Sequence, residues 1–295
     1  MNIIDEIKKS FKSGNALIKL LYVNIAVFLA VKIIGVIFFL LSIDPTFSLV
    51  SWFAVPADLH NLIFRPWTIF SYMFLHQDFW HILFNMVVLY VFGQIFLHYF
   101  DDKKLVSIYL VGGIAGAALY ILFFNLFPVF NQVIPISIAL GASASVMAIL
   151  VATAIYAPKH TVNLFFVVRT EIRYIAIVLV IVDILQIKSS NAGGHIAHLG
   201  GALFGYLYIS QLRKGKNITK GFDRFMDKIF SLFKRREKFK VTYKRPMTDI
   251  EKDIEYNKTQ AAAQQDIDKI LDKIAKSGYD SLTKREKEIL FKNSK

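Results

Sequence analysis

Cysteine is absent from the 295 residues, which excludes disulfide bonds, thiolate nucleophiles and Cys-ligated metal ions. A cleavable signal peptide is not expected either, because the first apolar run is too long for one and lacks a small-residue cleavage site. Acidic side chains are also scarce, with 22 Asp and Glu against 35 Lys and Arg, a net charge of +13. Hydrophobic residues, in contrast, make up 55% of the chain and the mean hydropathy is +0.46. A soluble protein of this length would be less apolar.

Several apolar runs approach the length of about 20 residues that a helix needs to cross the hydrocarbon of a membrane. The short fourth and sixth of these segments are expected to be shielded by neighbouring helices. The predicted fold is all-α, a polytopic membrane protein with a bundle of six transmembrane helices (residues 17–212) and a cytoplasmic helical tail. The predicted spans are Leu17–Leu41, Trp80–His98, Leu105–Phe127, Ala142–Ala157, Ile172–Ile187 and Ala197–Leu212.

The distribution of basic residues between the two ends of these spans predicts the orientation of the chain. Most of the basic residues near the spans lie at one end of them. The other end carries only Arg65 and Lys188, and residues 127–140 carry no charge. Both termini, including the N-terminal segment 1–16, are therefore expected in the cytoplasm. Positive charge there fits attraction to the anionic lipid of the bilayer, and no nucleic-acid partner is expected. The basic residues on the predicted cytoplasmic side are Lys8, Lys9, Lys12, Lys19, Lys103, Lys104, Lys159, Arg169 and Arg173.

Spans two, four and six all enter from the outer side, and each carries polar residues in its first turns. These are His81 and Asn85, then Ser143, then His198. The predicted topology puts them at one depth near the outer face. Polar groups within a membrane are costly and by default mark function. A serine and a histidine at matching depth suggest a nucleophile and its general base.

Small residues predict that the fourth and sixth spans pack closely, because they let helix backbones approach each other in lipid. Such packing would allow Ser143 and His198 to meet. The residues are Gly201, Ala202 and Gly205, on one stripe with His198, and Ala144, Ala148 and Ala152 at four-residue spacing.

Donors for an oxyanion are available from the same segments. Gly141 permits an unusual turn before Ser143, and the amide of Ser143 would be free at the start of a helix. His81 and Asn85 are four residues apart and share one helix face, so both side chains could add donors.

At this point the motifs resemble the rhomboid intramembrane serine proteases over roughly residues 15–212, so the six-span core is expected to be rhomboid-like. The resemblance implies that Ser143 is the nucleophile and His198 the base, with His81 and Asn85 on the oxyanion side. It also implies no metal and no cofactor, and cleavage of single-span transmembrane proteins near the extracytoplasmic face. We expect an integral protein of a bacterial inner membrane. The motifs are Arg65–Trp67 followed by FLHQDFWHILFN (Phe74–Asn85), GASAS (Gly141–Ser145) and HIAHLGGALFG (His195–Gly205).

Other interpretations stay open. Ser145 is a second serine, although a helix would turn it away from the face of Ser143. Asp183 is the one clear acid inside a predicted span, and it could complete a triad or act as a packing or gating residue. A non-catalytic membrane chaperone could share the fold. A transporter with a metal site is another class, and its ligands would be His76, His81, His195 and His198.

The tail after Gln211 turns charged and polar. Residues 213–240 predict a basic amphipathic helix that either lies on the inner leaflet or packs as a soluble helix against the core. Residues 241–295 predict a polar linker (Pro246–Gln265) and a small helical hairpin, whose partner the sequence does not identify. The segment Leu282–Leu290 is similar to the start of a DNA-binding helix-turn-helix, but no recognition helix is expected after it. The apolar face of the amphipathic helix would be Phe222, Phe225, Met226, Ile229, Phe230 and Phe233.

Overall fold

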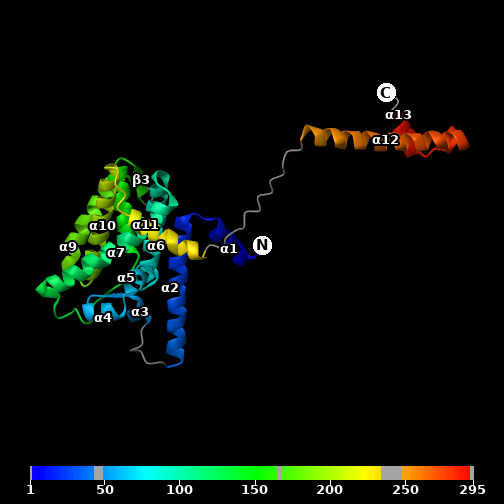
Figure 1. Cartoon of the computed structure of the whole chain (residues 1–295). Coiled ribbons are helices and arrows are strands. Elements are labelled where there is room, and N and C mark those ends of the chain that lie inside the picture. Colours follow the sequence, from blue (N-terminus) through cyan, green and yellow to red (C-terminus); the bar gives the residue numbers. More distant parts are fainter. Residues whose placement is uncertain (1, 43–48, 165–167, 234–247, 293–295) are drawn as a thin grey trace. The chain divides into compact units, whose positions relative to one another are not determined.

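The computed structural model describes residues 2–42, 49–164, 168–233 and 248–292. They form two compact units, Met1–Lys234 and Arg235–Lys295 (Figure 1). The first unit is a bundle of helices. Its longer helices are α1 (Ile3–Ser13), α2 (Ala16–Leu40), α6 (Phe79–Tyr99), α7 (Asp102–Leu126), α8 (Ser143–Tyr156), α9 (Ile172–Leu185), α10 (Ala192–Arg213) and α11 (Lys220–Phe233), and its short ones are α3 (Leu49–Phe53), α4 (Leu59–Phe64) and α5 (Thr68–Ser71).

All six segments predicted as spans are helices, which confirms the predicted helical character of each. Three of them, α2, α6 and α7, are individually long and apolar enough to cross a membrane, with mean hydropathies of 2.6, 1.7 and 2.1. The largest difference in bounds is in α10, which begins at Ala192 rather than at Ala197. The first turns of α10 contain glycines, polar residues and histidines. A prediction based on runs of apolar residues therefore misses this part of the helix. The number of spans stays a prediction.

Helix α8 lies at the centre of the bundle, packed against α6, α7, α9 and α10. It has only 14 residues, and every one from Ala144 to Ala154 is buried. A helix that is apolar all round is stable when other helices enclose it. The structure therefore agrees with the expectation that this short segment is shielded by its neighbours.

Glycines on two neighbouring helices allow this central position. A Cβ atom at Gly201 of α10 would overlap the carbonyl oxygen of Ala144, and one at Gly205 would overlap that of Ala148. On the other side, a Cβ at Gly116 of α7 would lie 2.6 Å from the Cβ of Ala144. The predicted small-residue contact between the fourth and sixth segments is thus present, and α7 adds a second one.

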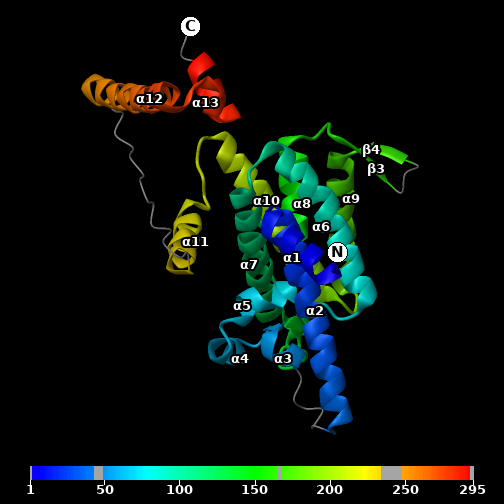
Figure 2. The ribbon, with the colours of Figure 1, turned by 90° about the vertical axis from the view of Figure 1, so that its right-hand side faces the viewer.

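Two small antiparallel strand pairs depart from the predicted all-α fold. The strand β1 (Val55–Pro56) pairs with β2 (Ile138–Ala139), and β3 (Thr161–Leu164) pairs with β4 (Val168–Glu171). Segments this short leave no periodic signal in a sequence, which is why apolar patterning misses them. The pair β1–β2 joins the connection after α2 to the segment that leads into Ser143. The β3–β4 hairpin lies at the opposite end of the bundle from α3 and α4 (Figure 2).

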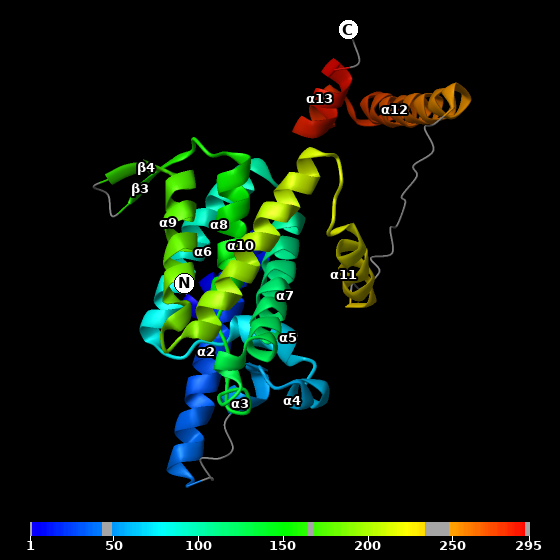
Figure 3. The ribbon, with the colours of Figure 1, turned by 90° about the vertical axis from the view of Figure 1, so that its left-hand side faces the viewer.

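Helix α11 is held beside α7 by its acidic residues (Figure 3). The buried Asp223 accepts a hydrogen bond of 2.5 Å from the Ser107 hydroxyl, and Lys103 lies 2.6 Å from Asp227. Phe225 on the apolar side is 58% exposed. The polar side of α11 thus contacts the bundle and leaves Phe225 outward. The side chains of Ile229, Phe230 and Phe233 lie outside the described residues.

The second unit is a helical hairpin of α12 (Asp249–Ser277) and α13 (Lys284–Lys292), as predicted for this end of the chain. Its first helix begins earlier than expected, so most of the predicted linker Pro246–Gln265 is helical. A capping box between Thr248 and Glu251 starts this helix, and the apolar residues of its first half, such as Ile250 and Ile254, are exposed. Hydrogen bonds from the Thr283 amide and from Lys273 lower the pKa of Glu286 to about 2 and join the two helices.

Substituting Gly201 by alanine tests the close contact of α8 and α10. The new methyl group would force the helices apart, and we expect a loss of about 1–3 kcal/mol in the free energy of unfolding. The measurement is thermal unfolding in detergent. The matched control is Gly35→Ala in α2, where a Cβ would meet nothing within 4 Å. Equal unfolding temperatures for the two variants would contradict this packing.

Candidate active site

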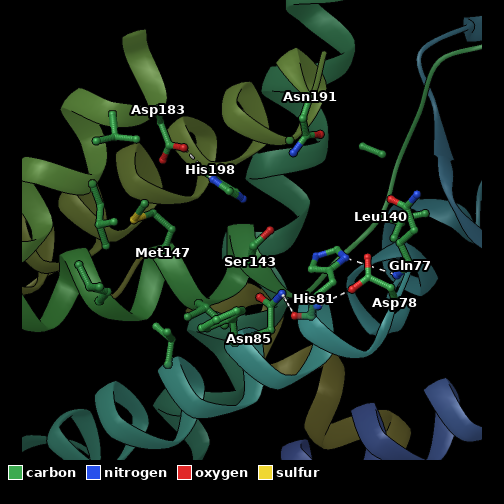
Figure 4. A pocket seen from close by; sticks show the side chains of 18 of the residues that line it. Gln77, Asp78, His81, Asn85, Leu140, Ser143, Met147, Asp183, Asn191 and His198 are labelled. Atoms are coloured by element: carbon green, nitrogen blue, oxygen red, sulfur yellow. Dashed lines mark hydrogen bonds and ion pairs between the residues drawn. The ribbon is translucent and has the colours of Figure 1, made fainter. Parts of the chain in front are cut away.

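A cavity of about 930 Å³ opens between α6, α8, α9 and α10. Its lining includes all four predicted site residues, His81, Asn85, Ser143 and His198, together with Asp183. They come from separate parts of the chain, and Figure 4 shows their side chains converging on one space. The structure therefore brings the predicted residues together.

Ser143 is the first residue of α8, directly after a tight turn. Gly141 in that turn has φ of +130°, a left-handed value that favours glycine, and its amide donates to the Tyr72 carbonyl over 2.9 Å. A Cβ at Gly141 would lie 2.9 Å from Nε2 of His81. Because Ser143 is in the first turn of the helix, its amide has no partner within α8 and stays free to donate.

Ser145 lies away from this space. It is fully buried, its hydroxyl is 3.9 Å from the sulfur of Met73, and it is absent from the cavity lining. A Cβ at Gly113 of α7 would lie 2.6 Å from that hydroxyl. The second serine is thus a packing residue, as the helical register predicted.

His81 is held by the residues just before it. Asp78 is the N-cap of α6 and accepts from the His81 amide, while the Gln77 amide donates to His81 Nδ1 over 3.3 Å. Since Nδ1 accepts, we assign the ring proton to Nε2, the nitrogen nearest to Gly141. The Gln77 carbonyl accepts in turn from Lys32 of α2 over 2.6 Å. Asn85 lies one turn further on, and its amide donates to the His81 carbonyl over 2.9 Å.

In His198 the ring proton is assigned to the other nitrogen, Nδ1. Its Nδ1 lies 2.9 Å from Oδ1 of Asp183, and an ionised carboxylate only accepts, so we assign the proton to Nδ1. The remaining nitrogen, Nε2, carries a lone pair. Figure 4 shows the ring between Asp183 and Ser143. Within the described residues no hydrogen bond joins the Ser143 hydroxyl to His198.

The four histidines of the transporter alternative do not gather at one point. His76 and His81 pack edge to face with ring centroids 5.1 Å apart. Among the described residues, the one cluster of three or more histidine or acidic side chains close enough to share an ion is Asp183, His195 and His198, whose ligand atoms lie within 4.8 Å of one another. Two imidazoles and a carboxylate suit zinc by type. In this structure, however, both Nδ1 atoms are directed at one carboxylate oxygen, His195 at 2.8 Å and His198 at 2.9 Å.

Three residues that support the site were not singled out from the sequence. Gln77 and Asp78 hold His81, and Lys32 holds Gln77. Lys32 carries a signal that could have identified it, because a charge inside an apolar span marks a polar partner. Gln77 acts through its backbone, which no side-chain motif reveals.

Comparisons with known proteins identify the family. The chain is 30% identical over 161 residues to RHOMBOID-like protein 12, mitochondrial, of Arabidopsis thaliana. The matched region covers 52% of this chain and 48% of that protein. It is 31% identical over 150 residues to Rhomboid protease AarA of Providencia stuartii, covering 46% and 52%. The chain thus matches about half the length of these relatives. Residues 250–295 match a family of unknown function, DUF6576. Residues 64–215 match the rhomboid domain, and with its apolar helices the chain is an integral membrane protein that belongs to the rhomboid family.

Proposed function

We propose that this protein is an intramembrane serine endopeptidase that hydrolyses peptide bonds of single-span membrane proteins. The observation that carries the proposal is the cavity in which Ser143 at the start of α8 faces His198 of α10. The name of its relative in Providencia stuartii, Rhomboid protease AarA, supports the same activity.

The reaction follows from the two side chains. The Ser143 hydroxyl attacks the scissile carbonyl carbon while Nε2 of His198 takes its proton. The tetrahedral intermediate then collapses to an acyl-serine, and the imidazolium of His198 returns the proton to the leaving amine. Water then attacks the acyl carbon while His198 takes one of its protons. The bond between the acyl carbon and the Ser143 oxygen breaks as His198 returns that proton to the oxygen, which releases the new carboxylic acid and restores Ser143. All groups in this sequence are supplied by the chain and by water.

The oxyanion of the intermediate would be stabilised by hydrogen-bond donors on the side of Ser143 away from His198. These are the Ser143 amide, the Nε2 proton of His81 and the side-chain amide of Asn85. Two histidines with opposite tautomers suit the two roles, since an oxyanion needs a donor and a serine hydroxyl needs an acceptor. The contact of Gln77 with Nδ1 of His81 supports this assignment.

The cut is proposed near the extracytoplasmic face of a bacterial inner membrane, with both termini of the enzyme in the cytoplasm. The basic residues support this orientation. Lys159, Arg169 and Arg173 lie in or next to the β3–β4 hairpin, at the end of the bundle away from the start of α8. Substrates would be transmembrane segments that enter the cavity from the bilayer.

Substituting Ser143 by alanine removes the proposed nucleophile. Cleavage of a single-span model substrate in liposomes should fall at least about 10³-fold, because the catalytic residues act as a unit. Ser145→Ala is the matched control, since it deletes the same hydroxyl two residues away in a packed position. We expect it to retain activity within a few-fold of the wild type.

Product bands on gels and mass spectrometry of the fragments measure this outcome. Full cleavage by the Ser143→Ala variant would overturn the proteolytic assignment. If the wild type itself bound substrate without cutting it, the membrane-chaperone alternative would be favoured instead.

Substituting Asn85 by alanine tests the oxyanion side. Loss of one such donor should reduce kcat by about 10²–10³-fold with little change in KM. The control is Asn125→Ala in α7, because Asn125 also donates to a carbonyl one turn earlier, that of Ile121, and to that of Ala57, but does not line the cavity. Steady-state kinetics on both variants decide the matter. Similar kcat values would argue against a catalytic role for Asn85.

A further inference from the structure

Asp183 is a buried carboxylate in the apolar helix α9, with 6% of its side chain exposed. Its Oδ1 lies 2.8 Å from Nδ1 of His195 and 2.9 Å from Nδ1 of His198, both on α10. Its Oδ2 is buried, without a hydrogen-bond partner among the described residues. Burying a carboxylate is costly unless it is paired, so these two histidines are what keeps it in place.

The position of the two histidines differs in one respect. His198 and Asp183 both line the cavity, whereas His195 does not. The two rings lie on one face of α10, three residues apart, with centroids 5.9 Å from each other. His195 therefore reaches the reacting groups only through Asp183.

We propose that Asp183 and His195 are positioning residues for the base: a hydrogen-bonded chain, called the relay below, runs from His195 through Asp183 to His198 and orients the histidine of the proposed dyad. This inference rests on the proposed proteolytic function. A neutral imidazole can hold its proton on either nitrogen, and only the tautomer protonated at Nδ1 presents a lone pair to Ser143. The carboxylate of Asp183 selects that tautomer, fixes the ring and stabilises the imidazolium formed during acyl transfer.

His195 adds a second constraint. A carboxylate with one partner could rotate about its Cβ–Cγ bond and exchange its oxygens. The donor from His195 holds Oδ1 between the two rings, so the oxygen that faces His198 stays the same. The hydrogen bonds of both histidines to the charged carboxylate are of the stronger, charge-assisted type.

The variants Asp183→Asn and His195→Leu test the relay. The Asp183→Asn substitution keeps the shape of the side chain but removes its charge, and the new amide could donate to Nδ1 and favour the wrong tautomer of His198. We expect kcat to fall by up to about 10⁴-fold in Asp183→Asn, the size of the loss when serine proteases lose their orienting carboxylate, with KM nearly unchanged. His195→Leu should lose roughly tenfold in kcat.

A conservative substitution separates positioning from packing at His195. In His195→Asn the side-chain nitrogen occupies nearly the place of Nδ1, so the donor to Asp183 is kept. Its kcat should recover to within about threefold of the wild type, although His195→Asn fills less volume than His195→Leu. If both variants were equally impaired, His195 would be a packing residue and its part of the proposal would fail.

The second readout is the tautomer itself. Nuclear magnetic resonance of isotope-labelled histidine in detergent-solubilised protein distinguishes protonated from unprotonated ring nitrogens, and the signals of His198 are identified by their loss in His198→Ala. We expect the proton on Nδ1 in the wild type and a shift toward Nε2 in Asp183→Asn. This measurement needs no substrate, so it also detects a variant that is folded but inactive.

The two hypotheses fail differently. If the wild type cleaves no membrane substrate, the proposed function fails while the tautomer measurement still reports on Asp183. If the wild type cleaves and Asp183→Asn keeps kcat within about twofold, the relay is overturned. An unchanged tautomer of His198 in Asp183→Asn would overturn it as well.

Discussion

The backbone contact between α8 and α10 sets the positions of Ser143 and His198, on which the proposed function depends. Gly201 and Gly205 let α10 rest directly on the carbonyl groups of Ala144 and Ala148. Ser143 immediately precedes this contact on α8, and His198 lies one turn before it on α10. The glycines therefore fix the positions of Ser143 and His198 along their helices relative to each other, although no hydrogen bond among the described residues joins the two side chains. On the other side, α7 approaches the central helix equally closely through Gly116.

Within this helix packing, the hydrogen-bond partner of each histidine determines which of its ring nitrogens carries the proton. A backbone amide holds Nδ1 of His81 as an acceptor and so leaves a donor at the cavity. A carboxylate holds Nδ1 of His198 as a donor and so leaves an acceptor. The two histidines thus present a donor in one case and an acceptor in the other, as the proposed mechanism requires. Lys32 of α2 donates to the carbonyl of Gln77, the residue that holds His81, and so connects α2 to the candidate site.

The sequence predicts the helices and the residues that line the candidate site well, but it does not predict the residues that hold them in place. Long apolar runs depend on composition, which one sequence contains in full, while the orientation predicted from lysine counts stays a prediction. The stripe of Gly201 and Gly205 also follows from spacing alone. Which face of α9 carries Asp183 toward α10 depends on the rotation of packed helices, and apolar periodicity is weak where a helix is apolar all round. For that reason Asp183 is visible as an unusual residue, while its two histidine partners are found only in three dimensions.

The central claim is that Ser143 is an activated nucleophile in the membrane. Its most direct test is reaction of the detergent-solubilised protein with a fluorophosphonate, followed by peptide mass spectrometry to locate the adduct. A serine becomes reactive toward such a probe when a base removes its proton. We predict one covalent phosphonyl group on Ser143 and none on Ser145, with labelling lost in His198→Ala. An adduct on any other residue, or a Ser143 that stays unlabelled in folded protein, would contradict the account.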